Sequence, residues 1–148
     1  MPATPDTRQP ETVLAFDFGL RRIGIAVGQD VTGSASPLGV AMNGSGGPNH
    51  QTIANLIAEW NPTTLVVGMP ANADGSVSEI QAHVRAFIAE LERYHLPIEA
   101  IDERYTSREA KATLKRARAA GTRGRISKEL IDSAAAVVIA ERFLASRL

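Results

Sequence analysis

The sequence predicts a mixed α/β domain, with a five-stranded sheet of three antiparallel strands followed by parallel strands, and helices on both faces. Short turns at Gly19-Leu20-Arg21 and Thr32-Gly33-Ser34 separate three apolar runs, so these runs should pair antiparallel. The run at 63–70, TTLVVGMP, is apolar without alternation, which is typical of a strand buried on both faces beside a parallel neighbour. Helical and strand patterns then alternate, as in βα units.

The N-terminal half contains the antiparallel unit and one helix. Strands are predicted at 13–19, 22–30 and 36–43, followed by a flexible loop at 43–49. A helix is predicted at 50–60, because its apolar residues recur at i, i+3, i+4 and i+7, namely Ile53, Leu56, Ile57 and Trp60. Asn61-Pro62 should end it before the strand at 63–70.

The C-terminal half alternates helix and strand and ends in two helices. A helix is predicted at 77–94, a strand at 97–104, and a helix from 106 to about 119 that begins with a capping box, Thr106 to Glu109. A basic loop at 119–126 precedes a last helix at 127–146. Right-handed crossovers place the later strands beside the first strand.

Length and composition indicate one domain in a reducing compartment. The chain has 148 residues and no cysteine, which excludes disulfides and thiolate metal sites. The polar, proline-rich residues 1–12 should form a disordered tail, and residues 13–148 a single domain. Since no apolar run approaches the roughly 20 residues of a membrane span, we expect a cytoplasmic protein that does not contact a membrane.

The net charge of zero hides a strongly basic segment. Residues 104–128 contain nine Lys and Arg and one acid, Glu109, a local charge of +8, whereas residues 1–103 contain five basic and twelve acidic residues. A field of this strength suits a polyanion such as nucleic acid. The alternative is a solvated helix face, although such faces rarely contain so few acids.

Acidic residues occur at three places where apolar neighbours make them unexpected. Asp17 lies inside the first strand, Asp102 and Glu103 end the last one, and Asp132 shares a helix face with Ala136 and Ile139. Asp102 and Glu103 must point to opposite faces of their strand, and the sequence leaves open which one meets Asp17. Converging carboxylates repel each other unless a cation lies between them, so we expect Mg²⁺ or Mn²⁺ in a two-metal site.

Each acid also has an ordinary structural explanation when it is taken alone. Asp17 could cap its turn, Glu103 could pair with Arg104, and Asp132 could pair with Lys128 one helical turn earlier. Their joint occurrence around a basic segment favours a site that hydrolyses phosphodiesters.

Four segments, in order, resemble one protein family. DFGLRRIGIAVGQD, VVGMPANADGS, DERYTSREA and IDSAAAVVIA together make residues 13–147 resemble the RuvX/YqgF family. These bacterial proteins were long described as Holliday junction resolvases and are now regarded as pre-16S rRNA nucleases. The resemblance implies an RNase H-like fold, an endonuclease that processes the 5′ end of pre-16S rRNA, and a catalytic and metal-binding triad of Asp17, Glu103 and Asp132. Asp102 falls in the same motif, and its role stays open.

The basic residues should then hold the nucleic-acid backbone, since phosphate contacts position a substrate without reading its sequence. By resemblance Arg22 is the basic residue after the first strand; the other predicted contacts are Arg104, Lys111, Lys115, Arg116, Arg118, Arg123 and Arg125. The expected partners are structured RNA or branched DNA and ribosomal precursor particles, with the protein a monomer rather than a dimer.

Three other functions fit part of the pattern. A resolvase of branched DNA would need a two-fold dimer, yet one core needs all the apolar stripes. A nucleic-acid-binding factor in transcription or ribosome assembly that does not cut would not need the three acids. An actin-like ATPase shares the Asp-x-Gly hairpin but needs a second similar domain, for which 148 residues leave no room.

Overall fold

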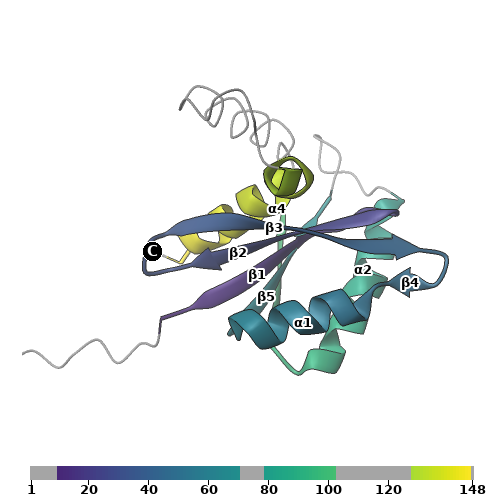
Figure 1. The fold of residues 1–148 in the computed structure, drawn as a ribbon, viewed down its shortest axis with the longest axis horizontal. Coiled ribbons are helices and arrows are strands. Elements are labelled where there is room, and N and C mark those ends of the chain that lie inside the picture. The colour runs from purple at the N-terminus through teal and green to yellow at the C-terminus, as the bar shows by residue number, and fades with distance from the viewer. Residues whose placement is uncertain (1–9, 71–78, 103–127, 148) are drawn as a thin grey trace, which may run out of the picture.

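The computed structural model describes residues 10–70, 79–102 and 128–147, and within them a mixed sheet lies between helices (Figure 1). The strands are β1 (Thr12–Asp17), β2 (Arg22–Gln29), β3 (Ser34–Gly44), β4 (Gly47–Pro48), β5 (Thr64–Met69) and β6 (Ile98–Asp102). The helices are α1 (His50–Trp60), α2 (Ile80–Leu91), a 3₁₀ turn η1 (Glu92–Tyr94) and α4 (Lys128–Ala145).

The predicted sheet topology is confirmed. The strand order is β4-β3-β2-β1-β5-β6, in which β2 pairs antiparallel with β1 and β3, while β5 pairs parallel with β1 and β6. The described sheet has six strands instead of the predicted five, because the loop expected at 43–49 contains β4, which pairs with the end of β3. Two residues with a proline carry no strand pattern, so the sequence could not reveal β4.

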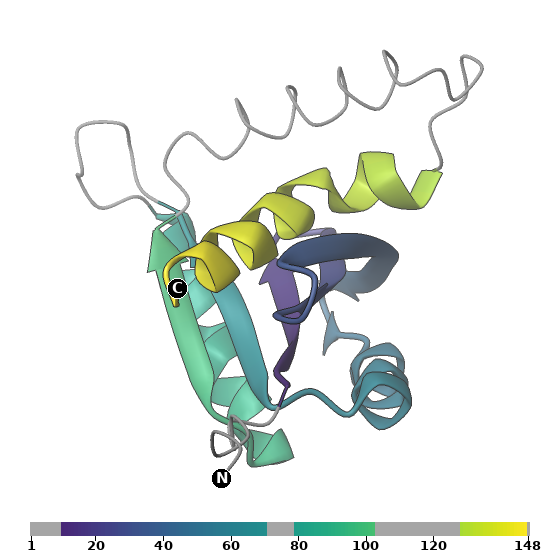
Figure 2. The same cartoon turned by 90° about the vertical axis from the view of Figure 1, so that its left-hand side faces the viewer.

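Two layers of helices cover the sheet, with α4 on one face and α1 and α2 on the other (Figures 1 and 2). Alternation along β1 divides its side chains between the layers. Leu14 and Phe16 pack with Phe87 of α2, whereas Val13 and Ala15 pack with Ile139 of α4. β1 is therefore buried on both faces, and so is β5, as its sequence predicted.

The close approach of α4 to the sheet requires a glycine in β2. A Cβ atom on Gly28 would lie 3.1 Å from Leu144 Cδ1, 3.2 Å from Val13 Cγ2 and 3.3 Å from Ala140 Cβ. These contacts are tighter than most real Cβ contacts, so Gly28 allows the helix to settle on β1 and β2.

Most predicted element boundaries agree with the structure to within a few residues. The helix at 50–60 is confirmed, and Asn49 caps it by accepting bonds from the backbone N–H groups of Gln51 and Thr52. β1 begins one residue earlier and ends two residues earlier than the strand predicted at 13–19, so Asp17 is its last residue and does not lie inside it. The helix predicted to reach 94 ends in η1 instead, where His95 takes the left-handed backbone conformation at φ 57°. The helix predicted at 106–119, the loop at 119–126 and most of the predicted tail lie outside the described residues.

The two ends of the described chain meet. Glu11 Oε2 lies 2.9 Å from Arg147 Nε, and the Arg147 guanidinium lies over the Phe143 ring at 5.1 Å from its centroid. In the described ranges no helix is both long and apolar enough to cross a membrane.

Candidate active site

Asp17 lies at the carboxyl end of β1, near the middle of the sheet. It is half-buried and pairs with Gly24 of β2. Because side chains alternate along a strand, Asp17 is on the same face as Val13 and Ala15, the face that α4 covers. β1, β5 and β6 are parallel, so their carboxyl ends meet at this one edge of the sheet.

Asp102, which ends β6 at the same edge, lies on the other face. Within β6, Ile98 packs with the core on the α2 side and Ile101 with the core on the α4 side. Alternation therefore directs the Asp102 side chain to the α2 side, and its partner in the pairing, Met69, also packs on that side. Asp102 is exposed and does not share a face with Asp17. Glu103 follows directly and lies outside the described residues.

The N-terminal half of α4 is attached to β3 by a buried serine. Ser133 Oγ donates to the Gly39 carbonyl at 2.7 Å and accepts from the Gly39 N–H at 2.9 Å. Gly39 pairs with Ile25, and Ile25 with Phe16, the residue before Asp17. At a strand spacing of about 4.8 Å, this attachment lies about 10 Å across the sheet from β1. The backbone of Asp132, the preceding residue, is therefore placed near the edge that holds Asp17, while its side chain is outside the described part.

The turn between β1 and β2 is held by one residue of β3. The Asn43 side chain donates from Nδ2 to the Gly19 carbonyl at 2.8 Å, and the Asn43 backbone N–H donates to the Arg21 carbonyl at 2.9 Å. Inside the turn, a Cβ atom on Gly19 would lie 2.5 Å from the Arg22 carbonyl oxygen, so no larger residue fits without a shift of backbone. Asn43 and Gly19 together fix the turn that directly follows Asp17.

A second long-range contact holds the end of β6. The Arg142 side chain of α4 donates from Nη1 to the Asp102 carbonyl at 3.0 Å. The last helix therefore contacts both flanks of the site, through Ser133 at β3 and Arg142 at β6.

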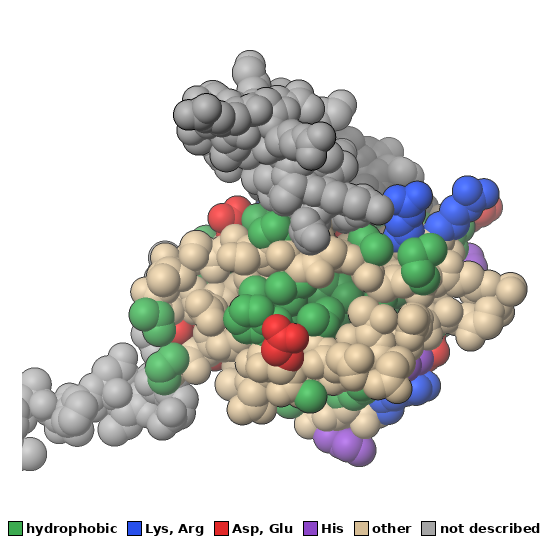
Figure 3. All heavy atoms as spheres, viewed as in Figure 1, with side chains coloured by type: hydrophobic (Ala, Val, Ile, Leu, Met, Phe, Trp, Pro, Cys, Tyr) green, Lys and Arg blue, Asp and Glu red, His purple; other side chains and the backbone are tan. Residues whose placement is uncertain are grey.

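The predicted basic contacts can be placed only in part. Arg22 begins β2 and is exposed, as is Arg21 before it. Blue side chains gather at the upper right of Figure 3, where β1 ends in Figure 1. The other seven predicted contacts lie outside the described residues, namely Arg104, Lys111, Lys115, Arg116, Arg118, Arg123 and Arg125.

The predicted carboxylate ligands suit a hard cation such as Mg²⁺, but the described residues alone do not form a complete metal site. Aspartate and glutamate oxygens are the ligands that Mg²⁺ and Mn²⁺ prefer. Among the described side chains, no group of three or more His, Cys, Asp or Glu could hold a metal ion, and neither Glu103 nor the Asp132 side chain belongs to that set. Of the three predicted ligands, the structure therefore places the side chain of Asp17.

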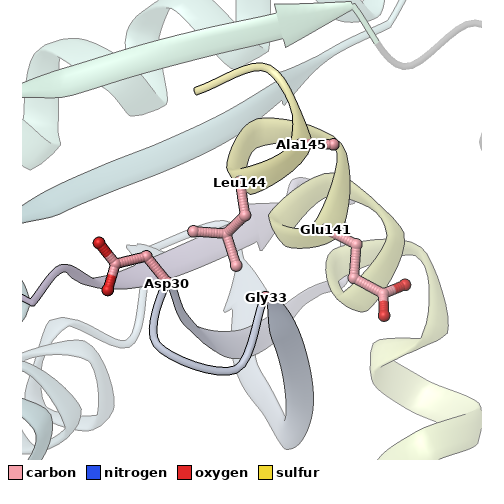
Figure 4. Close-up of a pocket in the computed structure, with 5 residues that line it drawn as sticks. All are labelled: Asp30, Gly33, Glu141, Leu144 and Ala145. Carbon is pink, nitrogen blue, oxygen red and sulfur yellow. The ribbon is translucent and has the colours of Figure 1, made fainter. Parts of the chain in front are cut away.

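A separate acidic hollow near the other end of α4 has a different character. Asp30, Glu141 and Leu144 help to line a cavity of about 110 Å³ (Figure 4). The two carboxylates point away from each other in that view, and Asp30 Oδ1 accepts the backbone N–H of Glu11 at 3.0 Å. The Asp30 carboxylate thus has a structural role in holding the start of β1.

Comparison with known proteins identifies the family. The RuvX profile, described as Holliday junction resolvase, matches residues 11–146. The chain belongs to the RuvX family. A relative in Chromohalobacter salexigens is 46% identical over 134 residues, covering 90% of this chain and 88% of the relative. One in Hahella chejuensis is 45% identical, covering 90% and 83%. Both relatives carry the name "Putative pre-16S rRNA nuclease".

Solved structures confirm the RNase H-like fold class of this RuvX-family chain. RuvC of T. thermophilus in complex with a Holliday junction substrate aligns with a TM-score of 0.58 at 15% identity, covering 93% of this chain and 95% of that chain. The Fowlpox virus resolvase bound to Holliday junction DNA aligns with a TM-score of 0.55 at 11% identity, covering 93% and 99%. At these identities the likeness concerns the fold.

Three residues near the site carry no sequence signal of their role. Asn43 bonds to the turn 24 residues away, Ser133 bonds to β3 94 residues away, and Arg142 bonds to β6 40 residues away. Such contacts depend on strand register and helix placement, which a single sequence does not reveal. The buried Ser133 within an alanine-rich helix is the nearest to a signal, because a buried hydroxyl needs a partner.

Proposed function

We propose that this protein is a metal-dependent endonuclease that processes the 5′ end of pre-16S rRNA. The observation that carries the proposal is the position of Asp17. It ends the central strand on the face that α4 covers, between the end of β6 and the N-terminal half of α4. Membership of the RuvX family and the names of its relatives support the activity and the substrate.

The proposed triad is Asp17, Glu103 and Asp132. Alternation along β6 favours Glu103 over Asp102, because Asp102 is directed to the opposite face and the next residue of a continued strand would share the face of Asp17. Position 132 precedes the buried Ala136 by four residues and Ile139 by seven, and this spacing supports its place on the same helix face in the proposal. The proposal thus assigns all three carboxylates to one edge and one face of the sheet.

Asp17, Glu103 and Asp132 would hold Mg²⁺ or Mn²⁺ in a two-metal site. When bound, such ions activate water and neutralise charge on the scissile phosphate and the leaving oxygen. The chain itself contributes a rigid frame, since Asn43 fixes the turn after Asp17 and Ser133 fixes α4 against β3. Holding the carboxylates in place before the substrate arrives avoids reorganisation during the reaction.

Binding of the substrate backbone is assigned to basic side chains. Arg22 is exposed at the site edge, and the segment 104–128 supplies the larger positive charge. We propose structured RNA and ribosomal precursor particles as partners of a monomeric protein in the cytoplasm, without a membrane role.

A resolvase of branched DNA is the second candidate, because the matching family profile is described as Holliday junction resolvase. The same carboxylates would serve either substrate, so the difference lies in what the protein binds. Symmetric cleavage of two strands would also require a two-fold dimer.

One experiment separates the candidates. The purified protein is incubated with a 16S rRNA precursor and with a four-way DNA junction in Mg²⁺ or Mn²⁺, beside Asp17→Asn. We expect cleavage of the precursor near its 5′ end and a loss of at least about 100-fold in Asp17→Asn, as removal of several kcal/mol of charge stabilisation implies. Preferential cleavage of the junction would favour the resolvase. Tight RNA binding without cleavage would favour a factor that does not cut.

A further inference from the structure

A hollow of about 270 Å³ lies next to the candidate active site, on the α2 side of the sheet. Its walls come from three places, namely the residues after Asp17, the β3–β4 hairpin and α2. Phe18 directly follows Asp17 and forms part of the wall, and alternation directs the two side chains to opposite faces, so the hollow and the proposed metal ligand lie on either side of the same sheet edge.

One part of the hollow offers apolar surface to solvent. Phe18, Leu20, Pro48 and Ala86 contribute to it, and the Leu20 side chain is 57% exposed. Phe18 also packs against Phe87, at 5.3 Å between ring centroids, so the core holds this ring in place. A fixed aromatic ring beside exposed aliphatic groups is a surface on which a flat, weakly polar group can stack.

The other part offers hydrogen-bonding groups. Asn43, Ser45, His83 and Glu90 line the hollow, so amide, hydroxyl, imidazole and carboxylate groups surround the apolar surface. The bond from Asn43 Nδ2 to the Gly19 carbonyl orients the Asn43 amide. His50 Nε2 lies 3.3 Å from Glu90 Oε1, so the imidazole of His50 lies beside the Glu90 carboxylate. Mixed donors and acceptors around a stacking surface match the edge of a nucleobase.

The size and surroundings of the hollow favour one nucleotide of a longer chain over a free small molecule. Pockets that enclose whole ligands measure about 300–1,000 Å³, and this hollow is smaller. Arg21 follows Leu20 of the wall and is exposed, so the turn that lines the hollow also carries a cation for a phosphate of that chain.

We propose that this hollow binds one unpaired base of the nucleic-acid substrate, across the sheet edge from the cleaved phosphodiester. The inference rests on the proposed nuclease function and deepens it, because it makes an unpaired nucleotide beside the cut part of what the protein recognises. The paired strands would stay outside the hollow while the extruded base occupies it.

Binding assays with matched RNAs test the inference. The probes are a short RNA duplex with one unpaired adenosine, the same duplex with an abasic residue at that position, and the fully paired duplex, all in EDTA. Stacking of one base supports a preference of about fivefold to a hundredfold for the unpaired adenosine over the abasic residue. We expect Ala86→Leu, which fills the hollow, to abolish this preference.

Two further variants make the result specific. Ala89→Leu is the control, since Ala89 is also an exposed alanine of α2 but does not line the hollow, and it should keep the full preference. Leu20→Ser should reduce the preference by removing apolar surface from an exposed position. Equal binding of the adenosine and abasic RNAs by the wild type would overturn the inference alone. Failure to bind any RNA would overturn the proposed function as well.

Discussion

Replacing Gly19 with alanine tests how tightly the turn after Asp17 is built. The added Cβ would lie 2.5 Å from the Arg22 carbonyl oxygen, well under the 3.0 Å below which real Cβ atoms essentially never approach another atom. The neighbour is backbone and cannot rotate away. The turn must therefore move, although Asn43 holds it at the carbonyls of Gly19 and Arg21.

The expected cost follows from that conflict. Overpacking against a fixed neighbour typically destabilises by about 1–3 kcal/mol. In a chain of this length each kcal/mol lowers Tm by about 2–4 °C, so Gly19→Ala should melt roughly 2–12 °C below the wild type. Because Asp17 and Arg22 flank the turn, the cleavage rate should also fall, even at temperatures where the variant is fully folded.

Thermal denaturation followed by circular dichroism, together with the cleavage rate, measures both effects. Gly46→Ala is the matched control, since a Cβ there would meet nothing within 4 Å, and its Tm and rate should stay near the wild-type values. If Gly19→Ala melted and cleaved like Gly46→Ala, the turn would not be constrained as the geometry indicates.

Three further changes test the packing of the fold. Ser133→Ala should cost about 1–3 kcal/mol in urea unfolding, because it removes the buried hydroxyl that bonds both the N–H and the carbonyl of the half-buried Gly39, and wild-type stability would contradict the attachment of α4. Gly28→Ala should lower Tm, since the new methyl group meets Leu144, Val13 and Ala140, and an unchanged Tm would show that α4 can shift freely. Burial raises the pKa of Tyr94, so the folded state favours the neutral phenol; this stabilisation is complete below the ordinary value of about 10 and is lost as pH rises above it. The free energy of unfolding should therefore fall less for Tyr94→Phe than for the wild type when the pH is raised from below about 10 to above it. Equal falls would show that the Tyr94 phenol does not stabilise the folded state in this way.

The sequence predicted the fold well because its strongest patterns are local. The apolar stripe of Ile53, Leu56, Ile57 and Trp60 marked α1 with the correct ends, and the unbroken apolar run in β5 indicated its central place. β4 was missed because two residues carry no periodicity. The α2 helix gave way to η1 before its predicted end, where His95 takes a left-handed conformation that no local pattern announces.

The sequence indicates the chemistry of the proposed site more directly than its geometry. An aspartate within an apolar run drew attention to Asp17, which the structure places at the carboxyl end of β1 and not inside it. The choice between Asp102 and Glu103 needed the packing of Ile98 and Ile101, because strand parity depends on where a strand lies against its neighbours. Asn43, Ser133 and Arg142 escaped prediction because their partners are brought near only by the folded sheet.

A titration with Mn²⁺ tests the central claim, that Asp17 rather than Asp102 belongs to the metal site. Calorimetry would measure the Mn²⁺ affinity of the wild type, Asp17→Asn and Asp102→Asn. The two variants are a matched pair, because each replaces one carboxylate at the same sheet edge with an amide. We expect at least about tenfold to a hundredfold weaker Mn²⁺ binding by Asp17→Asn and a wild-type affinity in Asp102→Asn. Undiminished binding by Asp17→Asn, or its loss in Asp102→Asn, would contradict this claim.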